Sequence, residues 1–89
     1  MTRKEILEHI ENNVAKLKEA VERVEGEHFD KVAEYLKDVN SRVLSPAQKK
    51  RIKEMSDETA TRIGELKEMI AEYEEDREII LEEIKSGLN

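Results

Sequence analysis

Apolar residues recur every three or four positions along most of this chain, and this spacing constrains the fold more than any other feature. The first stripe, within residues 7–24, alternates steps of three and four residues without a break. Such a heptad pattern places apolar side chains along one side of an α-helix and is typical of helices that pack lengthwise against each other. A second stripe begins at Phe29 and continues to Val43, one residue out of phase with the first. Gly26 lies between them, so we predict a helix over residues 3–40 with a bend or a break near this glycine.

A single segment of the sequence predicts a reversal of the chain. Ser45 is a favoured N-cap residue, Pro46 suits the first position of a helix, and Gln48 completes a capping box with Ser45. Proline also disfavours the helical conformation of the residue before it, so the preceding helix must end upstream of Ser45. We therefore predict a second helix over residues 46–87.

The apolar pattern of this second helix is less regular than that of the first. Met55, Thr59 and Ile63 follow one another in two steps of four residues, which is a stutter in the heptad pattern. The segment around them also contains poor helix formers and a candidate internal cap. A second break, at Ser56–Asp57, is therefore left open.

The two tracts have nearly equal lengths and are joined by a short turn, which predicts an antiparallel helical hairpin. Pairing residues whose numbers add up to about 87 brings Val21 opposite Leu66 within the apolar stripes. The same pairing places Gly26 and Gly64 at nearly the same level. The predicted fold is thus an all-α, coiled-coil-like hairpin that forms a single helical domain over residues 1–89.

A lone hairpin buries only the seam between its two helices, which rarely offsets the entropy lost on ordering the chain. Further apolar residues lie at the predicted open end of the hairpin, where the chain begins and ends. We therefore predict a homodimer that forms a four-helix bundle. The residues expected to mediate self-association are Ile6, Leu7, Ile10, Ile79, Ile80, Leu81 and Ile84. The alternative is a monomeric three-helix bundle, which requires a full break at Gly26.

Acidic residues gather at one level of the predicted hairpin with few bases beside them. This acidic belt consists of Glu8, Glu11, Glu72, Glu74, Glu75, Asp76 and Glu78. A solvated face is the simpler interpretation. The functional interpretation is that the belt docks a basic protein surface, for which the turn end of another subunit is one candidate. Arg77 falls at a seam position, where we expect it to pair with Glu11 or Glu74.

Basic residues gather around the predicted turn. This basic tip consists of Arg42, Lys49, Lys50, Arg51 and Lys53. Such a group could neutralise phosphates, so nucleic-acid binding is the alternative function. The stretch has no aromatic residue for base stacking, and the whole chain has a net charge of −6, both of which argue against it. The simpler interpretation is a solvated helix start.

The sequence offers little for catalysis. It contains no cysteine, no glycine-rich phosphate loop, no Ser–His–Asp set and no pair of histidines at zinc-binding spacing. Glu25 and His28 match the Glu-x-x-His spacing of di-metal bundles, but only once. We therefore expect no enzyme activity, no catalytic or metal-binding residues and no cofactor.

No apolar run approaches the roughly 20 residues that a membrane-spanning helix needs, and the segment MTRKEILEHI lacks the apolar core of a signal peptide. We expect a soluble, cytoplasmic protein. Its expected function is that of a small non-enzymatic interaction or assembly module, such as an adaptor, assembly factor or inhibitor. The expected partners are a second copy and an unidentified protein with a basic surface.

Overall fold

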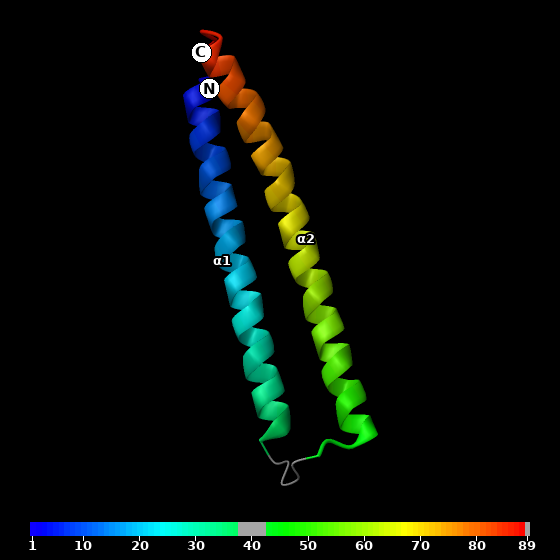
Figure 1. Cartoon of the computed structure of the whole chain (residues 1–89). Coiled ribbons are helices and arrows are strands. Elements are labelled where there is room, and N and C mark those ends of the chain that lie inside the picture. Colours follow the sequence, from blue (N-terminus) through cyan, green and yellow to red (C-terminus); the bar gives the residue numbers. More distant parts are fainter. Residues whose placement is uncertain (38–42, 89) are drawn as a thin grey trace.

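The computed structural model describes residues 1–37 and 43–88, and it folds them into two long helices. Helix α1 spans Arg3–Leu36 and helix α2 spans Pro46–Lys85. The helices lie side by side and run in opposite directions, so both ends of the chain lie at one end of the molecule (Figure 1). The described residues contain no strand. The predicted all-α antiparallel hairpin is confirmed.

Side-chain caps fix the first turn of each helix. The Thr2 hydroxyl oxygen accepts a hydrogen bond from the backbone N–H of Glu5 at 3.2 Å. Ser45 accepts from the backbone N–H of Gln48 at 3.1 Å, and the Gln48 side chain accepts from the backbone N–H of Ser45 at 2.8 Å. This is the predicted capping box with Pro46 next to it, and it satisfies amides that a helix start leaves without intrahelical partners.

A glycine ends helix α2. Gly87 has a φ of 83°, a left-handed conformation that residues with a Cβ rarely adopt. In this conformation the backbone N–H of Leu88 donates to the carbonyl of Glu83, and that of Gly87 donates to the carbonyl of Ile84, both at 3.0 Å. These two bonds form a Schellman motif, which satisfies carbonyls of the last helical turn.

Both helices are continuous where the sequence suggested that they might break. Helix α1 runs through Gly26, and helix α2 runs through Ser56–Asp57. A single glycine costs a helix only about 1 kcal/mol relative to alanine, which the flanking helix formers and the packing against α2 outweigh. The alternative of a three-helix bundle is therefore wrong. The predicted end of the first helix near residue 40 lies outside the described residues, and α1 is described up to Leu36.

The prediction that Phe29 lies in the seam is also wrong. Its side chain is 79% exposed, and the half-buried His28 occupies the seam instead, with Nδ1 3.0 Å from the Thr59 hydroxyl oxygen. The reason is the continuity of α1: without a bend at Gly26, the three- and four-residue steps continue from Val24 to His28. The next members of the out-of-phase stripe, Val32 and Leu36, are nevertheless half-buried in the continuous helix.

The predicted register between the helices is confirmed by contacts across the seam. His28 meets Thr59, Arg77 pairs with Glu11, and Arg3 pairs with Glu83. The residue numbers of these pairs add up to 87, 88 and 86. Residues 51–84 of α2 therefore lie close to the levels of residues 36–3 of α1, so that the two numbers at one level add up to about 87.

The two helical glycines do not mark a close approach of the helices. Both are exposed, and a Cβ added to Gly26 or Gly64 would meet no atom of the other helix and no side chain beyond its two chain neighbours within 4 Å, among the described residues. We expect Gly26→Ala and Gly64→Ala each to raise the free energy of unfolding by up to about 1 kcal/mol, because alanine loses less backbone entropy in a helix. Urea unfolding followed by circular dichroism measures this. Ala15→Gly, at an exposed position of α1, should lower the free energy of unfolding by a similar amount. If the alanine variants are less stable than the wild type, the two glycines do not lie at open helical positions.

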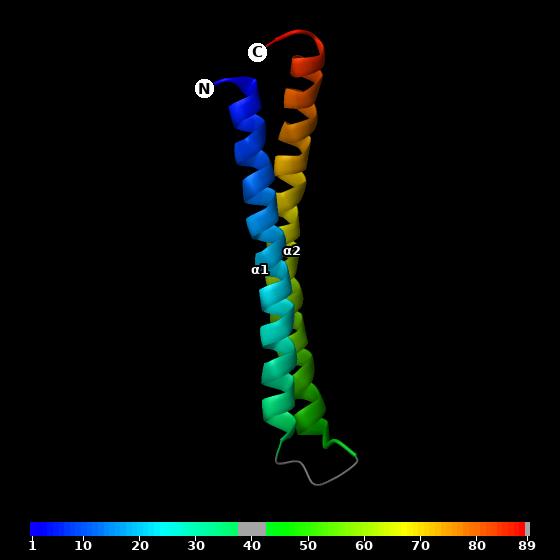
Figure 2. The same cartoon turned by 90° about the vertical axis from the view of Figure 1, so that its left-hand side faces the viewer.

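The core of the hairpin is thin. Of the apolar side chains in the described residues, only Ile10, Val21 and Leu66 are buried, and the rest of the seam is half-buried. The Cα atoms extend over 65 × 17 × 17 Å, with a radius of gyration of 19.9 Å against about 12 Å for a compact domain of this length (Figure 2). Most seam side chains are thus covered by a single neighbouring helix.

Candidate protein-interaction surfaces

The structure gathers part of the acidic belt around an open groove between the two helices. This belt groove has a volume of about 750 Å³. It is lined by Glu11, Val14, Lys18, Ala71, Glu74, Glu75, Arg77 and Glu78. Four residues of the predicted belt therefore share one site. The other three, Glu8, Glu72 and Asp76, are exposed outside this groove.

Arg77 supplies the main positive charge on the seam side of the belt groove. Its Nε lies 3.4 Å from a carboxylate oxygen of Glu11, and its Nη1 lies 3.8 Å from one of Glu78. The predicted pairing with Glu11 across the seam is confirmed, whereas the second contact goes to Glu78 and not to Glu74. Because these side chains are 40% exposed or more, such pairs contribute at most about 1 kcal/mol each. Arg77, together with Lys18 in the same groove, therefore offsets only part of the repulsion among the four carboxylates.

A second surface lies on α1 toward the turn end of the hairpin. It is a shallow apolar hollow lined by His28, Phe29, Val32, Ala33 and Leu36. Phe29 stands out from it into solvent. Contiguous exposed apolar patches, such as Phe29 forms with the lining of this hollow, often mark contact sites. The sequence could have indicated that Phe29 is exposed, because an unbroken helical spacing from Val24 to His28 places Phe29 outside the seam.

The residues predicted to mediate self-association differ in how accessible the structure leaves them. Ile10 is buried within the seam, and Ile79 is 57% exposed. The half-buried members are Ile6, Leu7, Ile80, Leu81 and Ile84.

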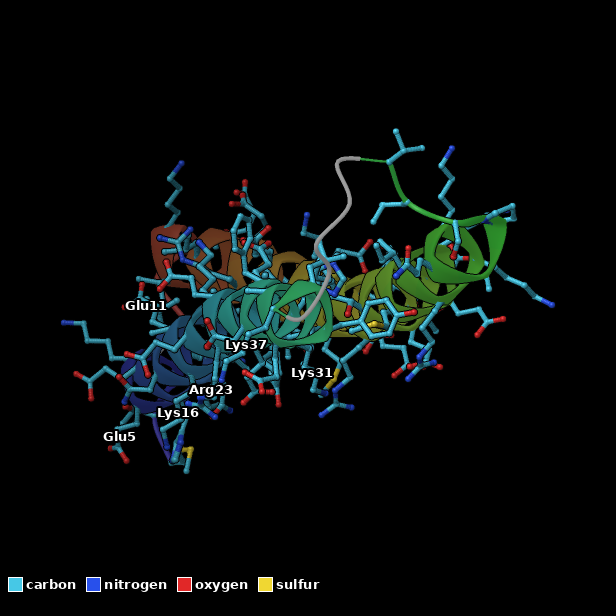
Figure 3. The ribbon with its side chains drawn as sticks, turned by 90° about the horizontal axis from the view of Figure 1, so that it is seen from below. Glu5, Glu11, Lys16, Arg23, Lys31 and Lys37 are labelled. Atoms are coloured by element: carbon cyan, nitrogen blue, oxygen red, sulfur yellow. The ribbon has the colours of Figure 1, made fainter. Side chains whose placement is uncertain are left out.

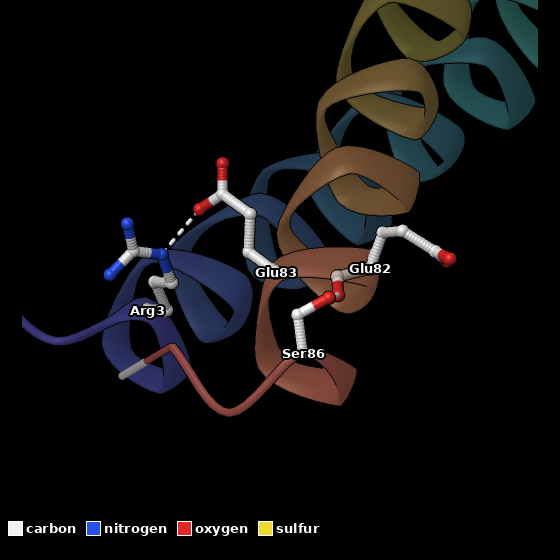
Figure 4. Close-up of polar contacts among 4 residues, drawn as sticks. All are labelled: Arg3, Glu82, Glu83 and Ser86. Carbon is white, nitrogen blue, oxygen red and sulfur yellow. Dashed lines mark hydrogen bonds and ion pairs between the residues drawn. The ribbon is translucent and has the colours of Figure 1, made fainter.

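The first turn of α1 and the last turn of α2 are held together by the ion pair of Arg3 with Glu83. Next to it, the Ser86 hydroxyl donates a 3.0 Å hydrogen bond to the carbonyl of Glu82 (Figure 4).

The basic tip lies at the opposite end of the hairpin from the two termini. Lys49, Lys50, Arg51 and Lys53 are exposed in the first turns of α2, whereas Arg42 lies outside the described residues. Arg51 pairs with the carboxylate of Glu54, with Nη1 and Oε2 3.7 Å apart. Charged side chains project outward from both helices, as seen along the molecule in Figure 3. Positive charge therefore concentrates at one end of the hairpin, and the acidic belt lies toward the other.

The described residues contain no group of three or more His, Cys, Asp or Glu side chains placed to hold a metal ion. His28 of the Glu-x-x-His motif contacts Thr59 across the seam. Over the same residues, neither helix has a stretch long and apolar enough to cross a bilayer.

Comparison with known proteins found no family model, no curated protein and no solved structure that matches the chain. Function is therefore inferred from the surfaces of this chain alone.

Proposed function

We propose that this protein is a small, non-enzymatic interaction module that acts by self-association, with two hairpins packing into a four-helix bundle. The observation that supports this most is the thin core. Only three apolar side chains of residues 1–37 and 43–88 are buried, while Leu17, Ile63 and Ile70 stay half-buried in the middle of the seam. A second hairpin would cover the sides of these residues that face solvent and would add the apolar burial that two helices lack.

The acidic belt supports a further part of this proposal, which is docking to a basic protein surface. Carboxylates of four belt residues surround one groove with a partial counter-charge from Arg77. Surface charges of this kind act mainly on the rate of association. Docking should therefore be fast at low ionic strength and should weaken as salt is added.

Thermal unfolding at several protein concentrations tests self-association. Because only the folded chain can form the bundle, the melting temperature should rise with protein concentration. Circular dichroism of the helical signal over a hundredfold range of concentration measures this shift. A melting temperature that stays constant over the whole range would contradict the proposal.

Binding of nucleic acid by the basic tip is the competing function, and it predicts a different result. We expect no retardation of single- or double-stranded DNA or RNA in a gel at low salt, because the chain has a net charge of −6 and the basic stretch of α2 contains no aromatic residue. Retardation that disappears in a Lys49/Lys50/Arg51→Ala variant would establish the competing function instead.

A further inference from the structure

We propose that the two hairpins pack antiparallel, with the basic tip of each copy against the acidic belt of the other and Phe29 of each copy in the belt groove of its partner. This inference rests on the proposed self-association and specifies its geometry. The occupant of the belt groove is thus a second copy of this chain.

Phe29 lies on the same side of the hairpin as the belt groove. Lys18 lines the belt groove and also the next groove along the molecule, which Glu22 and Glu25 border as well. Phe29 follows Glu25 by four residues and Glu22 by seven, which correspond to about one and two turns of helix. The side of α1 that carries these residues therefore carries Phe29 too.

Phe29 and the belt groove also lie at equal distances from the middle of the hairpin. Val21 and Leu66 are buried opposite each other near this middle. Phe29 lies eight residues from Val21 toward the turn, about 12 Å along the axis. Val14 lies seven residues from Val21 toward the open end, and Glu74 lies eight residues beyond Leu66 in the same direction. A twofold axis through the middle therefore brings Phe29 of one copy to the level of Val14 and Glu74 of the other.

One pair of opposite charges between the basic tip and the acidic belt agrees with the same axis. Lys53 lies thirteen residues before Leu66, and Glu78 lies twelve residues after it, so the axis brings Lys53 of one copy to the level of Glu78 of the other. Lys67 lines the groove next to the belt groove. Lys53 lies fourteen residues before Lys67, which is about four turns of helix, so the two lysines lie on the same side of α2. A parallel arrangement would instead place belt against belt and tip against tip, and such like-charge contacts oppose association.

The belt groove suits an aromatic ring. Val14 and Ala71 contribute apolar surface, and the carboxylates of Glu74 and Glu78 line the same groove. The edge of a phenyl ring is electropositive, so it is compatible with carboxylate oxygens around it. Because the axis repeats the contact, one dimer contains two identical Phe29 sites, and the assembly is closed.

Charge-reversal variants test this arrangement by sedimentation equilibrium, with circular dichroism to verify that each variant is helical. Lys49→Glu/Lys53→Glu and Glu74→Lys/Glu78→Lys should each weaken dimerisation at least about tenfold, because the substituted side chains lose their attraction to the partner and then repel the like charges of its belt or tip. The chain that carries all four changes should dimerise again, since its charges are opposite once more. Phe29→Ser should weaken dimerisation as well, without loss of the helical signal, because this side chain is exposed within the hairpin.

Lys16→Glu/Lys31→Glu is the matched control. It makes the same change in charge at exposed positions two residues away from Lys18 and Phe29, and these positions face other sides of α1. It should leave the dimerisation constant unchanged. If the wild type dimerises and both charge-reversal pairs dimerise as tightly, the antiparallel arrangement is wrong and the proposed self-association stands. A wild type that is monomeric at every concentration overturns both.

Discussion

Leu66→Ala should lower the free energy of unfolding by about 3 kcal/mol, because truncating a buried leucine removes its apolar burial and leaves a cavity. Leu66 is 6% exposed and is the only buried residue of α2. A domain of this size has a total stability of roughly 4–13 kcal/mol, so one substitution should remove a large part of it. Urea unfolding followed by circular dichroism measures the change, with the midpoint moving to much lower urea.

Met69→Ala is the control for this prediction. Met69 lies one turn further along α2 and is 46% exposed, so its truncation should cost well under half as much as that of Leu66. Equal losses at the two positions would show that the seam does not run where the structure has it.

Replacing His28 and Thr59 together by leucine should have the second-largest effect, and in the opposite direction. These side chains form a polar contact across the seam, at 3.0 Å and partly buried, between apolar neighbours such as Val24 and Ile63. Each leucine would add partial apolar burial worth about 1 kcal/mol, so the pair should raise the free energy of unfolding by about 2 kcal/mol. A higher urea midpoint measures this gain.

The double change must be made at once, since either one alone leaves a polar group without its partner. His9→Leu/Thr61→Leu is the matched control, because it makes the same chemical change at exposed positions of α1 and α2 and should alter stability by less than about 0.5 kcal/mol. A loss of stability in the seam variant would mean that the hydrogen bond outweighs the apolar burial.

The parts of the fold that depend on local chemistry could be predicted from the sequence. Ser45, Pro46 and Gln48 define the start of α2 through hydrogen bonds within one turn, and the structure has them as predicted. The register could also be predicted, because apolar stripes on two helices can meet in few ways. The pair of Arg77 with Glu11 follows directly from that register.

It was harder to predict which side chains face the seam far from a helix end, because this depends on the rotation of each helix about its axis. A bend at Gly26 would place Phe29 in the seam, whereas a straight helix places His28 there. Phe29 was predicted because it is the more apolar of the two residues. The continuity of α1 places His28 in the seam, and Thr59, at a stutter of α2, supplies it with a polar partner at the same level. The grouping of Glu11 with Glu74 and Glu78 in one groove needed the rotation of both helices about their axes, which composition does not reveal.

The mass of the protein in solution tests the central claim most directly. Light scattering coupled to size-exclusion chromatography should give about twice the chain mass of 10.4 kDa at micromolar concentrations and above. A second hairpin is expected because two helices alone bury only Ile10, Val21 and Leu66 among the apolar side chains of the described residues. A mass of 10.4 kDa at every concentration tested would contradict the account.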